Sequence, residues 1–131
     1  MRYVLLMRGA PDHWRAMDNW PAEDTKRHLA FLKDVDRQLT ATGELLWEEI
    51  LEPPERAKVV RAQPDGSPVV AKAAAPGARE PVLGCWLLDC DAPERAIHVA
   101  AQISATPGRG GQPLCLPVEV RPVMCAPGEE M

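Results

Sequence analysis

His28 lies in the stretch TKRHLAFLKD, in which apolar residues recur at helical spacing. On a helix, His28 shares one face with Phe31 or Leu32, Val35 and Leu39, so its imidazole points toward the core. Histidine is the side chain whose ordinary pKa lets it exchange a proton near neutral pH. His28 is therefore a candidate general acid or base, and the alternative is a core or interface histidine with satisfied hydrogen bonds.

A catalytic histidine needs a group that orients its ring, and the sequence offers several carboxylates. Asp24 precedes His28 by one helical turn, where it could orient the ring or raise its pKa. The alternative for Asp24 is a first-turn acid that favours the helix dipole. Asp89 and Glu48 or Glu49, on predicted strands, are the other candidates.

Arginines and tryptophans are the candidate substrate-binding residues. Arg8 and Arg121 lie near the ends of the predicted first and last strands and could hold a carboxylate or phosphate through paired hydrogen bonds. Trp20, Trp47 and Trp86 could form the walls of a pocket for a flat ligand, and the alternative is a core or dimer contact.

The remaining histidines and the cysteines do not indicate a metal site. His13, in a predicted loop, and His98, beside the apolar stripe of a predicted helix, are expected to be solvated. No C-x-x-C pair occurs among the four cysteines, which we expect to be reduced thiols, with Cys85 or Cys90 filling the core. We therefore expect no metal and no cofactor.

Length and charge restrict the class of protein. The chain has 131 residues, 46% of them hydrophobic and 26% charged, which fits a single domain over residues 1–124 with a loose tail at 125–131. A net charge of −4 without a basic patch argues against nucleic acid. The apolar runs are too short to cross a membrane, and no signal peptide is expected, so the predicted location is the cytoplasm.

The elements that must position these residues can be predicted from periodicity and turn residues. Alternation over 2–8 predicts a first strand, followed by a loop and a helix over about 22–42 that ends at Gly43. Residues 44–51, 57–61 and 68–72 predict three successive antiparallel strands, the last two joined by the Asp65-Gly66 turn.

The second half predicts a mobile connection, a central strand, a second helix and a last strand. The connection over 73–81 leads into an apolar central strand over 82–90. A helix follows with a capping box from Asp91 and Glu94. The last strand covers 116–123, and the predicted apolar stripe of the helix is Ile97, Ala100, Ala101 and Ser104.

This order predicts an α+β sandwich, with two helices on one face of a mainly antiparallel sheet. The second face of such a sheet exposes apolar residues, which predicts a homodimer or a bound ligand there.

The stretches RHLAFLK, TGELLWEEIL, VLGCWLLD, APERAIHVAAQI and VEVRPVM together resemble the YciI-like superfamily of YCII-related domain proteins, over residues 1 to about 124. The resemblance implies a ferredoxin-like fold, dimers that close into an α/β barrel, and a cleft with a His-Asp pair. His28 matches the histidine of that family. The aspartate of the DGPF motif falls near Lys72 here, and an aspartate found before a proline in some members is replaced by Thr106.

Two functions are consistent with these features. The first is a small-molecule enzyme of isomerase, dehydratase or lyase, or cyclase type, in which His28 moves a proton without a cofactor. The second is a non-catalytic small-molecule-binding or accessory protein on the same scaffold. The absent aspartates favour the second function, and the retained histidine favours the first.

Overall fold

The computed structural model describes residues 1–72 and 80–124. In chain order its helices and strands are β1 (Arg2–Arg8), α1 (His13–Asp18), α2 (Ala22–Ala41), β2 (Leu45–Ile50), η1 (Pro54–Arg56), β3 (Lys58–Ala62), β4 (Pro68–Lys72), β5 (Val82–Asp89), α3 (Pro93–Ser104), η2 (Arg109–Gly111) and β6 (Val118–Pro122). The predicted connection over 73–81 lies largely outside the described residues, and the predicted tail over 125–131 lies entirely outside them.

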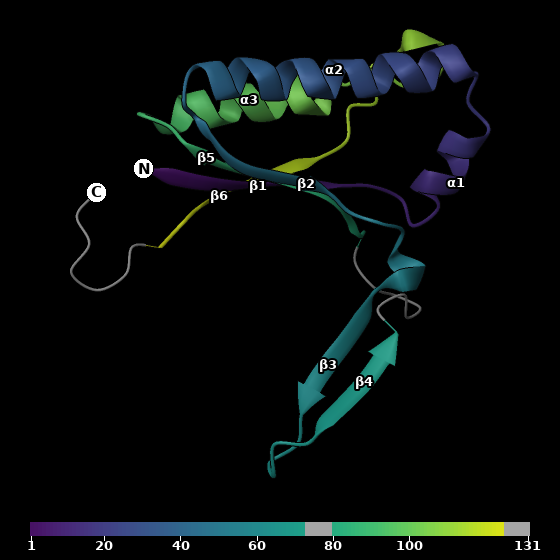
Figure 1. Ribbon diagram of the computed structural model, residues 1–131, viewed down its shortest axis with the longest axis vertical. Coiled ribbons are helices and arrows are strands. Elements are labelled where there is room, and N and C mark those ends of the chain that lie inside the picture. Colours follow the sequence, from purple (N-terminus) through teal and green to yellow (C-terminus); the bar gives the residue numbers. More distant parts are fainter. Residues whose placement is uncertain (73–79, 125–131) are drawn as a thin grey trace.

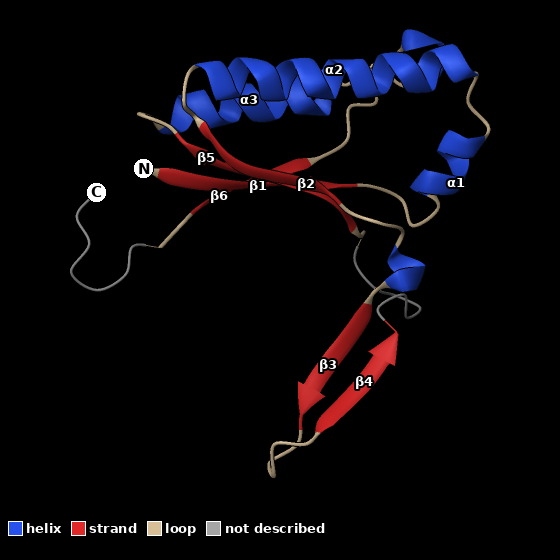
Figure 2. Ribbon diagram, in the orientation of Figure 1, coloured by secondary structure: helices blue, strands red, loops and turns tan. Residues whose placement is uncertain are grey.

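An antiparallel sheet with strand order β2-β5-β1-β6 forms the body of the protein. The long helices α2 and α3 lie together over one face of this sheet (Figure 1). Figure 2 shows the same separation into a helical layer and a strand layer. The predicted α+β architecture with a mainly antiparallel sheet is confirmed, and its strand order is compatible with a ferredoxin-like sandwich.

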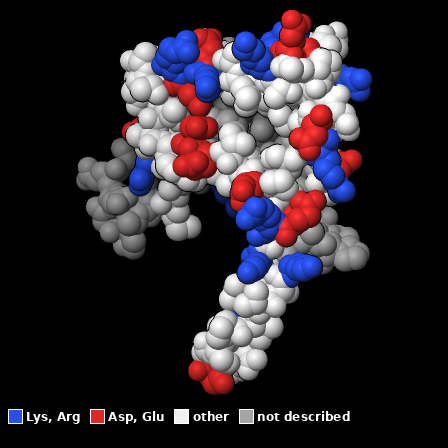
Figure 3. Space-filling view, turned by 45° about the vertical axis from the view of Figure 1, so that its right-hand side comes forward, with Lys and Arg blue, Asp and Glu red and all other residues white. Residues whose placement is uncertain are grey.

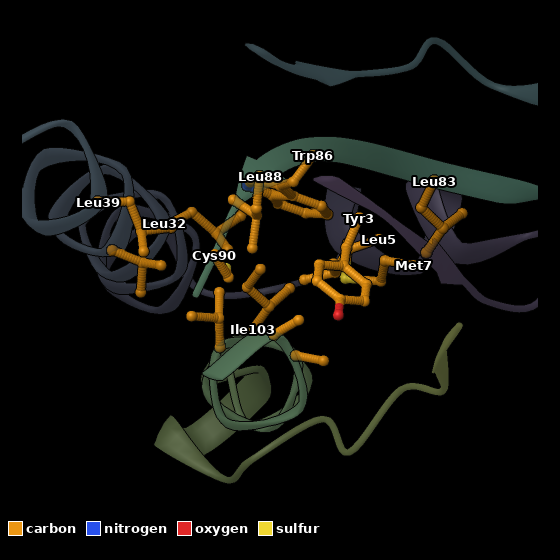
Figure 4. Packing of buried hydrophobic residues seen from close by; sticks show 14 residues of the cluster. Tyr3, Leu5, Met7, Leu32, Leu39, Leu83, Trp86, Leu88, Cys90 and Ile103 are labelled. Carbon is orange, nitrogen blue, oxygen red and sulfur yellow. The ribbon is translucent and has the colours of Figure 1, made fainter. Parts of the chain in front are cut away.

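The core lies between the sheet and the two helices. Tyr3, Leu5 and Met7 alternate along β1 and are at most 2% exposed, whereas the residues between them are half-buried on the other face. Trp86 and Leu88 of β5 pack into the same space (Figure 4). One face of the sheet packs against helices, and within the described residues no helix covers the second face, hereafter the helix-free face.

Helix α2 carries the buried stripe that the sequence predicts. Its buried residues are Asp24, His28, Leu32, Val35 and Leu39. The helix ends at a glycine, Gly43, whose φ of 77° lies in the left-handed region. No described helix is long and apolar enough to cross a membrane.

Helix α3 differs from its prediction at its start and in its buried face. The residue before it is Ala92, with no capping side chain, so the capping box from Asp91 and Glu94 is wrong. Pro93 starts the helix without such a cap because a first-turn proline has no N–H to satisfy. Of the predicted stripe, Ala100 is buried, whereas Ile97 is 58% exposed. The other buried residues of the helix are Ala96, Val99 and Ile103. Packing selects the face that buries two β-branched side chains.

Strands β3 and β4 do not join the main sheet. They pair only with each other among the described strands, and β2 pairs with β5 instead of β3. The predicted run of three successive antiparallel strands is therefore wrong at its first pair, because Pro53 and Pro54 interrupt the backbone after β2. The predicted Asp65-Gly66 turn is confirmed: the Asp65 Oδ1 accepts from the Ser67 backbone N–H at 2.9 Å.

Candidate functional site

His28 contacts the loop that follows α3. It is 4% exposed, and its Nδ1 lies 3.0 Å from the Pro107 carbonyl oxygen and 3.3 Å from the Thr106 Oγ1. A carbonyl only accepts hydrogen bonds, so the neutral ring carries its proton on Nδ1 and donates it to Pro107. The Nε2 atom then holds the lone pair that can accept a proton.

The Nε2 atom of His28 is the ring nitrogen without a hydrogen bond to the described part of the protein. No hydrogen bond joins Nε2 to any group of the described residues. Over the same part of the chain, every fully buried side-chain nitrogen or oxygen has a hydrogen-bond partner. Nε2 therefore keeps some solvent-exposed surface, although His28 as a whole is only 4% exposed.

Burial decides the charge of this ring. Desolvation lowers the pKa of His28, and the hydrogen bond to the Pro107 carbonyl opposes that shift less strongly. The imidazole is accordingly neutral at neutral pH. A neutral ring with a fixed Nδ1 proton and an accessible Nε2 can act as a base.

Aromatic rings surround His28 on the side of α1. The indole of Trp20 meets the His28 ring edge-to-face at 5.5 Å between centroids, and the His13 ring meets the same indole at 6.5 Å. His13 also lies 5.6 Å from Trp14. The structure thus joins Trp20, one of the predicted substrate-binding residues, to His28.

Sequence reasoning missed His13. The predicted loop around it is the six-residue helix α1, too short to show a helical period. Burial lowers the pKa of His13, and the nearby positive charge of a protonated His28 lowers it further, while Asp12 opposes the shift. The sequence signal that could have found this residue is the close succession of His13, Trp14 and Trp20 before the helix of His28.

Asp24 bonds to the backbone of Gly110 and not to His28. Its Oδ2 accepts a hydrogen bond from the Gly110 backbone N–H at 2.9 Å, and its Oδ1 lies 3.9 Å from an Arg27 nitrogen. Within the described residues no hydrogen bond joins Asp24 to His28. Asp24 therefore holds the same loop that supplies Thr106 and Pro107 to the ring.

That loop packs closely because it contains glycine. A Cβ atom on Gly108 would collide with the Leu114 side chain and would lie 3.5 Å from the Trp20 indole. Thr106, which stands where some proteins of the resembled family have aspartate, is fully buried beside His28. The loop thus supplies a hydroxyl and a carbonyl to the ring.

Three predicted substrate-binding residues lie on the helix-free face, across the sheet from His28. Arg8 and Arg121 both form ion pairs with Glu119, with nitrogen–oxygen distances of 3.4 Å and 2.9 Å. Glu48 pairs with the core residue Trp86 and therefore lies on the helix-covered face of the sheet. Its neighbour Trp47, which is 49% exposed, points to the opposite face. The structure therefore brings these three residues to one surface of the sheet, away from His28.

Trp86, the remaining predicted substrate-binding residue, is a core residue at 1% exposure. Its Nε1 donates to the Asp36 Oδ1 at 3.1 Å, and Asp36 is hydrogen-bonded to Glu48. Burial raises the pKa of both carboxyls, and for Glu48 the neighbouring charge of Asp36 adds to the rise. Glu48 thus interacts with Asp36, and Asp89 forms an ion pair with the amino group of Met1 at 3.3 Å. Within the described residues neither acid is seen to orient His28.

The described cysteines form no metal site. Cys85 and Cys90 are buried free thiols, as the sequence predicts, and burial raises the pKa of each. In residues 1–72 and 80–124 no three metal-ligating side chains come together.

No protein-family model matches this chain, and no curated protein matches it. The function must therefore be argued from the site itself.

Proposed function

We propose that this protein is a small-molecule enzyme that uses His28 as a general acid/base without a cofactor, in an isomerase, dehydratase or lyase, or cyclase reaction. The observation that carries the proposal is the hydrogen bond from Nδ1 of His28 to the Pro107 carbonyl, which leaves Nε2 unprotonated and, within the described residues, without a hydrogen-bond partner. The resemblance of the sequence to YciI-like proteins, which includes this histidine, supports the same reaction class.

The surroundings of His28 restrict the substrate. The Trp20 indole offers a flat apolar wall, which suits a planar or conjugated molecule. A base with a lowered pKa removes only relatively acidic protons, such as a hydroxyl proton or a C–H next to a carbonyl. His13, whose ring also meets the Trp20 indole, is the candidate group that returns the proton.

One observation favours the second function, a non-catalytic ligand-binding protein. Asp24 binds the Gly110 amide and leaves His28 without a carboxylate to stabilise a charged ring. A protein of this kind would bind a small organic ligand beside His28 without moving a proton.

The finer architecture is also a proposal. We infer that two copies pack through their helix-free faces as a homodimer, closing into a dimeric α/β barrel. The partly exposed apolar side chains on that face, Val4, Leu6 and Leu87 with Trp47 beside them, support this packing. Arg8, Arg121 and Glu119 supply a polar rim.

The experiment begins without a known substrate. Long-range ¹⁵N–¹H NMR of the imidazoles should show His28 as the Nδ1–H tautomer, with a pKa below the ordinary histidine value. A small-molecule library is then screened by ligand-observed NMR, and each bound compound is followed for conversion. His28→Asn should lower conversion at least about 100-fold with the fold retained, because the asparagine amide can still donate to Pro107.

His98→Asn is the matched control, since His98 is an exposed histidine on α3, and it should leave conversion unchanged. If bound compounds are never converted, or if His28→Asn converts them as fast as the parent protein, the enzyme proposal fails. Ligands that bind without conversion would establish the binding protein instead.

A further inference from the structure

We propose that the hairpin of β3 and β4, residues 58–72 and hereafter the arm, packs along a second copy of this chain. This inference rests on the proposed homodimer and adds a surface that the helix-free face does not include. The arm extends well beyond the sheet and helices (Figure 1).

The arm has too little packing within its own chain. Every residue of its two strands is exposed, including Val59 at 44%, Val60 at 60%, Val69 at 45% and Val70 at 56%. An isolated two-stranded hairpin is marginally stable in water. An arm that keeps its strands paired therefore needs a surface to pack against.

Each face of the arm carries an exposed apolar pair. Val60 pairs with Val70 on one face, and Val59 pairs with Ala71 on the other. A hairpin that stands in water normally alternates apolar and polar faces. Figure 3 shows the arm as a largely uncharged surface with acidic atoms at its tip. The apolar stretch has the composition of a contact surface.

The direction of the arm selects the second copy as the occupant. The arm leaves the sheet on the side away from α2 and α3, which is the side of the helix-free face (Figure 2). A sheet packed on that face would lie about 10 Å away, and a five-residue strand spans about 17 Å. The arm is long enough to pass the partner's sheet, and two-fold symmetry would place one arm on each side.

Charge supports the same occupant. The arm contains three basic residues and one acidic residue, whereas the whole chain has a net charge of −4. The remainder of the chain is therefore more acidic than the arm, and a second copy offers a complementary surface.

The test measures the dimer dissociation constant by sedimentation velocity over a dilution series. Val60→Lys/Val70→Lys should weaken the dimer at least tenfold and leave the circular dichroism spectrum of the body unchanged, because neither valine touches the core. Leu29→Lys/Ile97→Lys, which charges two exposed residues of the helical layer, is the matched control and should not change the constant. Amide hydrogen exchange of residues 58–72 should slow as protein concentration rises.

The outcomes separate the arm from the homodimer. A dimer whose constant is unchanged in the arm variant, with arm exchange independent of concentration, overturns the inference and leaves the homodimer standing. A parent protein that is monomeric at all concentrations overturns both. Neither result bears on the acid/base role of His28.

Discussion

The tautomer of His28 is set by a backbone carbonyl. A carboxylate in the same position would add a negative charge beside the ring and raise its pKa, whereas the Pro107 carbonyl orients the ring with only a small effect of that kind. Because burial lowers its pKa, the ring is a weaker base than an ordinary histidine and is neutral at neutral pH. Such a base suits a substrate whose reacting proton is already acidic.

Asp24 acts on the loop, and this role gives a prediction at the residue scale. Asp24→Ala removes the carboxylate that accepts from Gly110 and leaves a half-buried amide unpaired, so we expect a loss of about 1–3 kcal/mol in the free energy of unfolding. Urea denaturation measures the loss. The pKa of His28, followed by NMR in the same variant, should stay at its parent value.

Asp34→Ala is the control, because Asp34 is an exposed acid on the same helix, and it should cost well under 1 kcal/mol. A fall in the pKa of His28 in the Asp24 variant would contradict this assignment, since it would mean that the Asp24 charge acts directly on the ring.

The contact between α2 and β2 contains a carboxyl pair that couples folding to pH. Asp36 and Glu48 share a hydrogen bond, and burial raises the pKa of each. A raised folded-state pKa means that the folded protein binds protons more tightly than the unfolded chain. The stabilising contribution is therefore present at acidic pH and is lost as the pH rises through the folded-state values.

Glu48→Gln should reduce this pH dependence. Glutamine can still donate to Asp36 and carries no charge, so the variant should be more stable than the parent protein at pH 7, and the difference should shrink toward pH 4. Thermal unfolding at several pH values measures this. Glu52→Gln, an exposed acid that follows the same strand, is the control. A variant less stable than the parent at pH 7 would refute the pairing.

Among residues 1–72 and 80–124, helices cover one face of the sheet and not the other, and the proposed homodimer follows from that asymmetry. Leu87 lies near the middle of the helix-free face, on the strand that pairs with both β1 and β2. Leu87→Arg would place a charge at the centre of the proposed interface, so we expect a monomer at micromolar concentration by light scattering. Leu29→Arg, on the exposed side of α2, should remain dimeric like the parent protein. Equal masses for both variants and a monomeric parent would rule out the homodimer.

The sequence by itself determined the elements whose signals are local. Alternation predicted β1 over residues 2–8, and the stripe from His28 to Leu39 with Gly43 at its end predicted α2. The Asp65-Gly66 pair predicted the hairpin turn. These signals are reliable because side-chain period and left-handed turns depend on a few neighbouring residues.

Only the tertiary structure decided which residue His28 bonds to and which strands pair. Pro107 lies 79 residues from His28 in the chain, and the pairing of β2 with β5 spans the whole arm. The sequence of α3 contains two possible apolar stripes, one with Ile97 and one with Val99 and Ile103. The second stripe is the one that packs against the sheet. Such choices depend on which surfaces meet after folding, and no local period in the sequence encodes that meeting.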